Sequence, residues 1–235
     1  MPPSTAPPSL QSQLDAITAQ TRALVQPERL AIVDASIHDL LLSGIESRIL
    51  PVGAPAPSFA LPAASPTALS PSAPATKLVR SADLLALGPV ILNFFRGRWC
   101  PYCVTELEAW QSSYADLRAR GALLVAISPQ LPRQNDFLVQ QHSLTFPVLS
   151  DPGCRLAEAF GIAYTIPQPM QAHFRSILVN IPFVNGDQGK LTWRLPLPAT
   201  FVIKPTINRE GVVAFAEAHA DHRVRPDPLD VLRIL

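Results

Sequence analysis

Hydrophobic residues follow two patterns along the chain: short continuous runs, and longer stretches in which they recur every three or four positions. The helical spacing predicts helices over 101–120, 133–142, 151–160, 168–179 and 228–235. The continuous runs predict buried strands over 90–95, 122–128, 146–149, 200–204 and 212–217. Strands that alternate with helices and end in a hairpin and a last helix predict an α/β fold.

Two amphipathic helices are predicted ahead of this domain. Ser9 is a suitable N-cap for the first, and Pro27 begins the second, which stops near Gly44. We therefore divide the chain into an N-terminal helical extension, 10–50, and a main domain, 51–235. The apolar faces of the two helices either pack on the chain's own core or form a contact with a second copy (a homodimer) or another partner. An amphipathic stripe fits both interpretations.

Three segments do not fit the alternation of strands and helices. Residues 1–9 and 62–76 consist almost entirely of Pro, Ser, Ala and Thr, so we predict a disordered tail and a flexible surface loop. Residues 163–196 form a long insertion before the hairpin. A connection of this length is expected to be functional or to cover an edge of the sheet.

Composition narrows the function. The net charge is +1 and there is no basic run, which argues against nucleic acid as a partner. The N-terminus lacks the basic and apolar regions of a signal peptide, and no apolar run approaches the roughly 18 residues of a membrane span. We therefore expect a cytoplasmic protein with no membrane partner. Three cysteines do not make a disulfide scaffold and favour a catalytic use in a reducing compartment.

The strongest chemical signal is the segment Trp99-Cys100-Pro101-Tyr102-Cys103, between the strand predicted at 90–95 and a helix. Proline is a typical first residue of a helix, so Cys100 is expected at the helix N-terminus. Backbone N–H groups and the helix dipole stabilise a thiolate there. Cys103 follows within one helical turn, so the two sulfurs are close enough for a disulfide.

Nearby residues have both a functional and an ordinary interpretation. Arg96 and Arg98 either lower the thiol pKa values or are solvated loop residues. Trp99 either shields the thiols from water or belongs to the core. The cysteine pair itself has two alternatives: inert packing in the core, or a zinc site, for which His219 and His222 form the other close pair of candidate ligands.

The cysteine motif resembles the active sites of thioredoxins and glutaredoxins. The wider segment from Phe94 resembles the peroxiredoxin-like branch of the alkyl hydroperoxide reductase/thiol-specific antioxidant (AhpC/TSA) family, whose members carry a similar Phe-Tyr/Phe-Arg-Gly-x-Trp-Cys-Pro-Tyr-Cys segment. The resemblance covers about 52–235 and implies a thioredoxin-like fold, with a central mixed sheet flanked by helices. Further similar segments are 55–62, 126–130, 146–151 and 198–202.

The resemblance assigns the catalytic roles in two different ways. By similarity to thioredoxins Cys100 attacks first, whereas by similarity to peroxiredoxins Cys103 attacks and Cys100 takes the place of a hydroxyl residue. Glu106 matches the family's acidic residue. Pro198 stands where peroxiredoxins have an activating arginine; it resembles the cis-proline of thioredoxin-fold proteins or, alternatively, is a proline at the start of a strand. The residues expected to replace the arginine are Arg96, Arg98 or Arg194.

The activity implied is that of a thiol peroxidase that reduces hydrogen peroxide or organic hydroperoxides through Cys100 and Cys103. Thioredoxin, glutaredoxin or glutathione would recycle the disulfide, and no metal, haem, flavin or other cofactor is implied. Cys154 is a weaker candidate for a resolving cysteine. The alternatives are a thiol-disulfide oxidoreductase, a reductase of a small endoperoxide-like metabolite, and a non-catalytic binding module that the disulfide switches.

Overall fold

The computed structural model describes residues 8–64, 78–186, 193–208 and 210–235. Most of the predicted 1–9 tail and 62–76 loop therefore lies outside the described residues. The loop prediction is wrong for its first three residues. Pro62 ends a strand, Ala63 bridges to Leu149, and the Ala64 N–H donates to the Val148 carbonyl at 2.8 Å. Both alanines are small enough to be buried against the sheet, so a low apolar content does not prevent order here.

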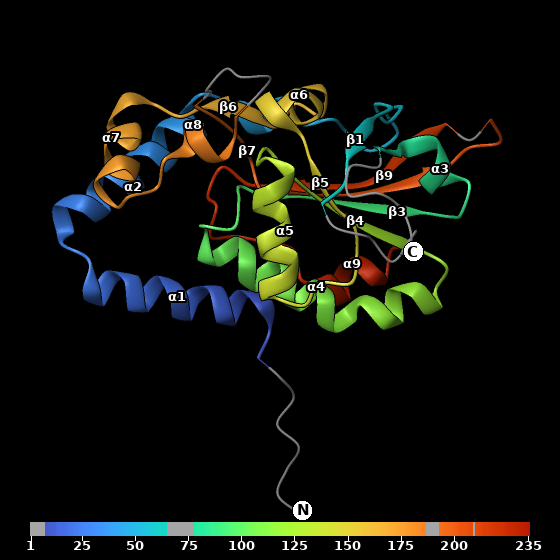
Figure 1. The fold of residues 1–235 in the computed structure, drawn as a ribbon, viewed down its shortest axis with the longest axis horizontal. Helices are drawn as coiled ribbons and strands as arrows, with labels where there is room; N and C mark the ends of the chain where they lie inside the picture. Colours follow the sequence, from blue (N-terminus) through green and yellow to red (C-terminus); the bar gives the residue numbers. More distant parts are fainter. Residues whose placement is uncertain (1–7, 65–77, 187–192, 209) are drawn as a thin grey trace, which may run out of the picture.

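The centre of the domain is a five-stranded mixed sheet of order β5-β4-β3-β8-β9 (Figure 1). Strands β3, β4 and β5 are parallel, whereas β8 is antiparallel to both β3 and β9. The predicted strands, the terminal hairpin and the mixed α/β class are confirmed. The strands are β3 (Val90–Phe94), β4 (Leu123–Ser128), β5 (Val148–Ser150), β8 (Ala199–Pro205) and β9 (Gly211–Ala218).

Side chains alternate between the two faces of β3, and each face has its own apolar core. Leu92 and Phe94 pack in one core with Phe160, whereas Ile91 packs in the other with Trp110. The first core is covered by α3 (Ser81–Leu85) and α6 (Arg155–Ala159). The second core is covered by α4 (Pro101–Ala119), α5 (Pro132–Gln141) and α9 (Pro228–Leu232). Helix α9 is shorter than the predicted 228–235.

The two N-terminal helices, α1 (Leu10–Leu24) and α2 (Pro27–Leu42), pack on the chain's own domain. Ser9 caps α1 as predicted, because its Oγ accepts from the Ser12 N–H at 3.2 Å. The start of α1 lies against α4, with Leu14 completely buried, but Leu24 at its far end is 76% exposed. After α2 the chain turns at Gly44, which has φ +68°, into the short 3-10 helix η1 (Ile45–Arg48).

The predicted insertion lies at the end of the sheet where β3 ends. Its helix α7 packs on α2, and Figure 1 shows α2, α7 and α8 gathered there, opposite α3 and β1. None of the described helices is long and apolar enough to cross a membrane. The remaining elements are β1 (Ala60–Pro62), β2 (Leu78–Arg80), the 3-10 helix η2 (Pro152–Cys154), β6 (Ala163–Thr165), α7 (Gln168–Ser176), α8 (Ile181–Val184) and β7 (Arg194–Pro196).

Candidate active site

The two cysteines of the motif lie where β3 passes into α4. Cys100 is the N-cap of α4 and Pro101 is its first residue, as the sequence predicts. The N–H groups of Cys103 and Val104 donate to the Cys100 carbonyl, each at 3.1 Å, and close the first turn. Cys100 is 2% exposed and Cys103 is completely buried. Both are thiols in this structure.

Gly97 allows the loop before the motif to close tightly. Its φ is +149°, and a Cβ at this position would lie 2.6 Å from Trp99 Nε1 and 2.9 Å from Gln130 Cδ. The Gln130 side chain fixes the loop, because its Oε1 accepts a hydrogen bond from the Arg98 N–H at 2.7 Å. A glycine is therefore required for Trp99 to fold back beside the cysteines.

The two thiols differ in pKa. Burial would raise the pKa of Cys100, but hydrogen bonds from Cys103 and the positive charges of Arg96 and Arg225 lower it to about 6. Burial and the neighbouring Cys100 raise the pKa of Cys103 well above its usual range. These opposite directions favour the thiolate on Cys100 and the neutral thiol on Cys103.

A buried ion pair lies next to Cys103. Arg225 Nη2 is 3.7 Å from the Cys103 Sγ, and Arg225 Nε donates to Glu106 Oε2 at 2.7 Å. Glu106 also accepts from Asn93 Nδ2 at 2.7 Å. Burial raises the pKa of Glu106 to about 7, although the charge of Arg225 acts in the opposite direction. Sequence patterns indicated Glu106 but not Arg225, which is 122 residues from Cys103 and belongs to no motif.

Arg96 is the second buried cation near the thiols. It is 4% exposed, and its guanidinium lies 5.0 Å from the Trp99 ring centroid and 5.9 Å from that of Phe174. In the described part of the chain, its Nε has no hydrogen-bond partner. Arg96 and Trp99, both predicted as site residues, therefore lie together at the thiols.

Arg98 and Arg194 bond to other acceptors, which favours Arg96 among the three arginines expected to replace the missing one. Arg98 is exposed, and its Nε donates to Gln134 Oε1 at 2.9 Å. Arg194 donates to the Gly153 carbonyl at 3.0 Å and pairs with Glu158 at 3.2 Å. Each side chain finds an acceptor on a nearer element and is held away from the cysteines.

Pro198 is not a cis-proline, and the expectation taken from thioredoxin-fold proteins is corrected. The described chain has no cis peptide bond, and Pro198 simply leads from β7 into β8. The trans isomer is intrinsically favoured, and the first position of a strand tolerates the missing N–H. The Pro198 carbonyl accepts from the His219 N–H at 3.4 Å.

Cys154 does not join the redox pair. It packs in the core on one face of the sheet, whereas Cys100 and Cys103 pack in the core on the other face. Cys154 and the two redox thiols therefore belong to different apolar cores. A resolving role for Cys154 does not fit this placement.

Cys100 lines a pocket of about 190 Å³ whose walls come from segments far apart in the sequence. These are α1, α2, the insertion helix α7, the start of α4 and the segment around 222–223. Trp99 and Phe174 form one wall in an edge-to-face contact with centroids 5.1 Å apart. The Tyr102 hydroxyl is 3.1 Å from Thr18 Oγ1, which ties the cysteine motif to α1.

Charged groups lie at the rim of this pocket. Asp34 on α2 pairs with Arg223 at 2.8 Å and with Arg22 at 3.7 Å, so one carboxylate links α1, α2 and the C-terminal segment. Burial and the nearby arginines lower the pKa of His222 well below its usual range. His222 therefore faces the pocket as a neutral imidazole, stacked edge-to-face on Tyr102.

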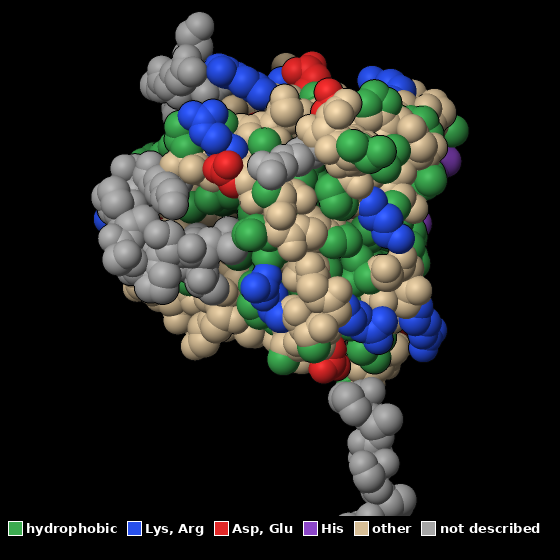
Figure 2. All heavy atoms as spheres, turned by 90° about the vertical axis from the view of Figure 1, so that its right-hand side faces the viewer, with side chains coloured by type: hydrophobic (Ala, Val, Ile, Leu, Met, Phe, Trp, Pro, Cys, Tyr) green, Lys and Arg blue, Asp and Glu red, His purple; other side chains and the backbone are tan. Residues whose placement is uncertain are grey.

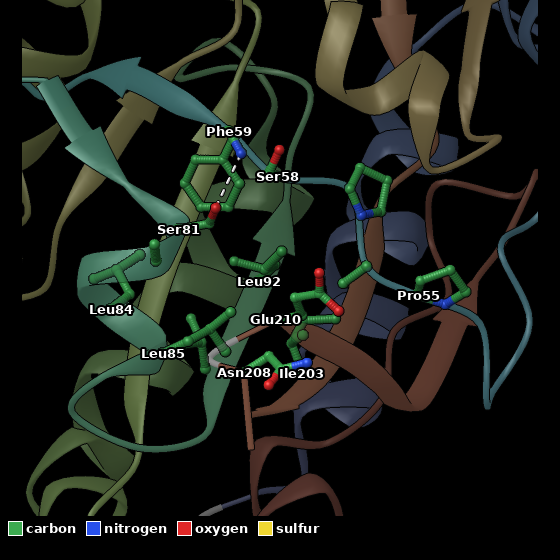
Figure 3. A pocket seen from close by; sticks show the side chains of 15 residues that line it. Pro55, Ser58, Phe59, Ser81, Leu84, Leu85, Leu92, Ile203, Asn208 and Glu210 are labelled. Atoms are coloured by element: carbon green, nitrogen blue, oxygen red, sulfur yellow. Dashed lines mark hydrogen bonds between the residues drawn. The ribbon is translucent and has the colours of Figure 1, made fainter. Parts of the chain in front are cut away.

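A larger cavity of about 550 Å³ lies at the opposite end of β3. Figure 2 looks onto this end of the molecule, where apolar side chains are interspersed with Lys and Arg. Figure 3 shows Leu85, Leu92 and Ile203 lining the cavity, with Glu210 beside them. The cavity contains no thiol and is distant from the candidate chemistry. The described residues include no group of three or more His, Cys, Asp or Glu side chains suited to a metal ion.

Comparison with known proteins adds three findings. A Haemophilus influenzae protein assigned as the peroxiredoxin bcp is 30% identical over 73 residues, which are 31% of this chain and 47% of that protein. The thiol-disulfide oxidoreductase ResA of Oceanobacillus iheyensis is 27% identical over 83% of this chain and 82% of its own length. The crystal structure of the peroxidoxin BcpB from Mycobacterium tuberculosis superposes with a TM-score of 0.54 and 20% identity, over 79% of this chain and 96% of that one.

The matched proteins differ in how much of their own length this chain covers. The chain spans about half the length of the first of these relatives. The structural neighbour confirms the thioredoxin-like fold of the peroxiredoxin type that the sequence predicts. Residues 52–214 match the AhpC/TSA family, and this match covers more than half of the 235 residues. The chain therefore belongs to the AhpC/TSA family.

Proposed function

We propose that this protein is a thiol peroxidase in which Cys100 attacks the peroxide and Cys103 resolves the product. The observation that carries the proposal is a thiolate with a pKa of about 6 at the base of a pocket, with a second thiol directly behind it. The peroxiredoxin alignment favours Cys103 as the attacking thiol, but that sulfur is completely buried and its pKa is raised. The difference in pKa and in access favours Cys100.

In the first step the Cys100 thiolate attacks the terminal peroxide oxygen. The O–O bond breaks, the proton of the peroxide goes to the leaving oxygen, which departs as water or an alcohol, and Cys100 becomes a sulfenate that takes up one proton from solvent to give the sulfenic acid. Negative charge develops on this leaving oxygen in the transition state. The guanidinium of Arg96 is buried and lines the same pocket as Cys100, which supports a role for it in stabilising this charge.

In the second step Cys103 must lose its proton to attack the Cys100 sulfur. Glu106, with a pKa of about 7, belongs to the hydrogen-bonded group that contacts Cys103 through Arg225 and is suited to accept that proton. The Cys100–Cys103 bond forms and the sulfenic oxygen leaves as water. Two thiol equivalents from thioredoxin, glutaredoxin or glutathione then reduce the disulfide.

A thiol-disulfide oxidoreductase is the second candidate, because the similarity to ResA extends over 83% of the chain. Exchange with a protein disulfide requires that sulfur to reach Cys100. This thiol is 2% exposed, and helices α1, α2 and α7 enclose its pocket. The narrow access favours a small oxidant such as a peroxide over a folded protein.

Peroxide consumption tests the proposal directly. The wild-type protein, supplied with a thiol regenerating system, should consume hydrogen peroxide or an organic hydroperoxide. With a sulfenic-acid trap, the label should appear on Cys100 in the Cys103→Ser protein and be absent from Cys103 in the Cys100→Ser protein. A trapped sulfenic acid on Cys103 would reverse the two roles. Disulfide reduction without any peroxide consumption would favour the second candidate.

A further inference from the structure

We propose that the pocket at Cys100 takes substrates that carry a carboxylate or a similar oxyanion, and that Arg96 binds this group. The inference deepens the proposed function and rests on one part of it, that Cys100 is the reacting thiol. It concerns the charge of the substrate and holds for an organic hydroperoxide and for a small disulfide alike.

The first argument is the contrast between the two buried arginines. Arg225 is satisfied, because its Nε bonds Glu106 at 2.7 Å and its Nη1 bonds the carbonyls of His222 and Val224 at 2.6 and 2.7 Å. Arg96 has no carboxylate partner among the described residues, and its Nε is buried without an acceptor. A buried cation without hydrogen-bond acceptors is costly, so an acceptor supplied by a ligand would bind strongly.

The second argument is the geometry of the guanidinium group. The Arg96 guanidinium lies over both the Trp99 and the Phe174 ring, and these contacts do not use its N–H groups as hydrogen-bond donors to oxygen. Arg96 interacts with the Cys100 thiolate through charge, and its guanidinium carries five N–H donors. A carboxylate takes two of these donors in parallel, which a neutral peroxide cannot do.

The third argument is the remainder of the pocket. Met170 and Phe174 from α7, Ile177 directly after it, and Leu30 and Val33 from α2 give it an apolar wall. At the rim Arg22 and Arg223 are balanced by Asp34 and by Asp221, which pairs with Arg223 at 2.9 Å, so Arg96 supplies the positive charge inside the pocket. The substrate class that fits is a small organic acid with an alkyl or aryl body next to the reacting group.

Two disulfide reagents, one anionic and one neutral, test whether the pocket favours an anionic substrate, and the test does not require peroxidase activity. Dithiobis(nitrobenzoate) carries two carboxylates, and dithiodipyridine is neutral near pH 7. In both cases the Cys100 thiolate attacks one sulfur and releases one aryl thiolate. Cys103 then displaces the second, so the reagent gains two electrons and the protein forms the Cys100–Cys103 disulfide.

The matched variants are Arg96→Gln and Arg98→Gln, since Arg98 is an exposed neighbour bonded to Gln134. Loss of thiolate character in Arg96→Gln slows both reagents, so the informative quantity is the ratio of the two rates. We expect the rate with dithiobis(nitrobenzoate) divided by the rate with dithiodipyridine to fall by at least about tenfold in Arg96→Gln, which is the effect of one charge-assisted hydrogen bond. The same ratio should stay unchanged in Arg98→Gln.

Benzoate supplies a second readout that involves no disulfide chemistry. It should protect Cys100 from alkylation by neutral iodoacetamide in the wild-type and Arg98→Gln proteins, and not in Arg96→Gln. An unchanged reagent ratio together with equal protection in all three proteins would overturn the inference. Benzoate protection in a protein that consumes no peroxide would uphold the anion site while refuting the proposed peroxidase activity.

Discussion

At the scale of single residues, the site separates a reactive thiol from a protected one. Hydrogen bonds and two arginines favour the charged form of Cys100, whereas burial favours the neutral form of Cys103. The two sulfurs lie within one helical turn, so their different surroundings, and not their positions in the motif, determine which one reacts. This difference leads to a direct prediction about pH.

Alkylation of Cys100 by iodoacetamide should accelerate as the pH rises through about 6 and level off above about pH 7, since the pKa is about 6 and only the thiolate reacts. Mass spectrometry of the Cys100 peptide at a series of pH values measures this. In Arg96→Gln the midpoint should move to higher pH, because a positive charge is lost, while Arg98→Gln should match the wild type. A wild-type midpoint at the usual cysteine pKa of about 8.5 would contradict the assignment.

Removal of Arg225 should destabilise the fold. Arg225→Met leaves the Glu106 carboxylate buried with the Asn93 side-chain amide as its hydrogen-bond donor, at 2.7 Å. Breaking a buried ion pair from one side typically costs about 3–5 kcal/mol of unfolding free energy. Urea denaturation at pH 8, where the wild-type Glu106 with its pKa of about 7 is ionised, should show this loss.

The pH dependence and a double variant serve as controls for that prediction. At pH 5 the carboxyl of Arg225→Met can take a proton and become neutral, so the loss of stability should shrink as the pH falls. Adding Glu106→Gln should likewise restore part of the stability at pH 8. An equal loss at both pH values, unchanged in the double variant, would mean that the ion pair is not its cause.

Residues near the motif were predictable from the sequence, and distant ones were not. Arg96, Trp99 and Glu106 lie within a few positions of the cysteines, so the strand–loop–helix geometry brings them together. Arg225 reaches Cys103 across 122 residues, through packing of the C-terminal segment that no local pattern encodes. The choice among Arg96, Arg98 and Arg194 likewise depended on which side chain finds another acceptor.

At the scale of elements, the β3–α4 connection depends on Gly97. Gly97→Ala should displace Trp99, because the new Cβ would lie 2.6 Å from its Nε1, and should cost about 1–3 kcal/mol of stability. Gly121→Ala is the control. Gly121 has φ +72°, but a Cβ there meets no atom within 4 Å, so this variant measures the cost of an alanine at positive φ without a clash. Thermal unfolding and tryptophan fluorescence measure the two effects. Equal losses in both variants, with unchanged fluorescence, would exclude the clash as the cause.

The docking of α1 should contribute to the stability of the whole domain. Leu14 is completely buried against the α4 side of the sheet, so Leu14→Ala should cost about 2–5 kcal/mol. Leu24, at the other end of the same helix, is 76% exposed, and Leu24→Ala should change stability by less than about 0.5 kcal/mol. Urea denaturation compares the two. Equal, small effects would show that α1 is not a part of the folded core.

Hydrophobic periodicity predicted the existence of elements better than their extent. The run at 122–128 and the spacing at 133–142 correspond closely to β4 and α5, because each buries a continuous apolar face. Periodicity cannot show where burial ends, so α9 stops at Leu232 and the α1 stripe extends to an exposed Leu24. The order at 62–64 comes from backbone hydrogen bonds to β5, which composition does not reveal.

At the scale of the whole molecule, two segments that the sequence set apart from the main domain complete its site. The N-terminal extension and the 163–196 insertion were predicted as separate additions, and the insertion was expected to be functional or to cover a sheet edge. In the fold, α1, α2 and α7 meet above Cys100 and form the pocket walls. Their meeting depends on contacts such as α2 with α7, between segments over a hundred residues apart.

These walls should select reactants by size. Cys100 is 2% exposed, so we expect the reduced protein to react with the small disulfide dithiodipyridine far faster than with insulin. Reaction with insulin would require α1 and α2 to move away. An opening that costs roughly 1.4 kcal/mol or more would slow it by at least about tenfold. Single-turnover rates, followed by loss of the Cys100 and Cys103 thiols, measure both reactions.

Asp34→Ala should weaken this size selection, because Asp34 joins α2 to Arg223 at 2.8 Å and to Arg22 on α1 at 3.7 Å. The rate with insulin should rise, while the rate with dithiodipyridine, which already fits, should stay the same. Asp39→Ala removes an exposed carboxylate from the same helix and should leave both rates unchanged. If wild-type protein reduces insulin as fast as the small disulfide, the walls do not restrict access, and protein disulfides become the better candidates for the physiological oxidant.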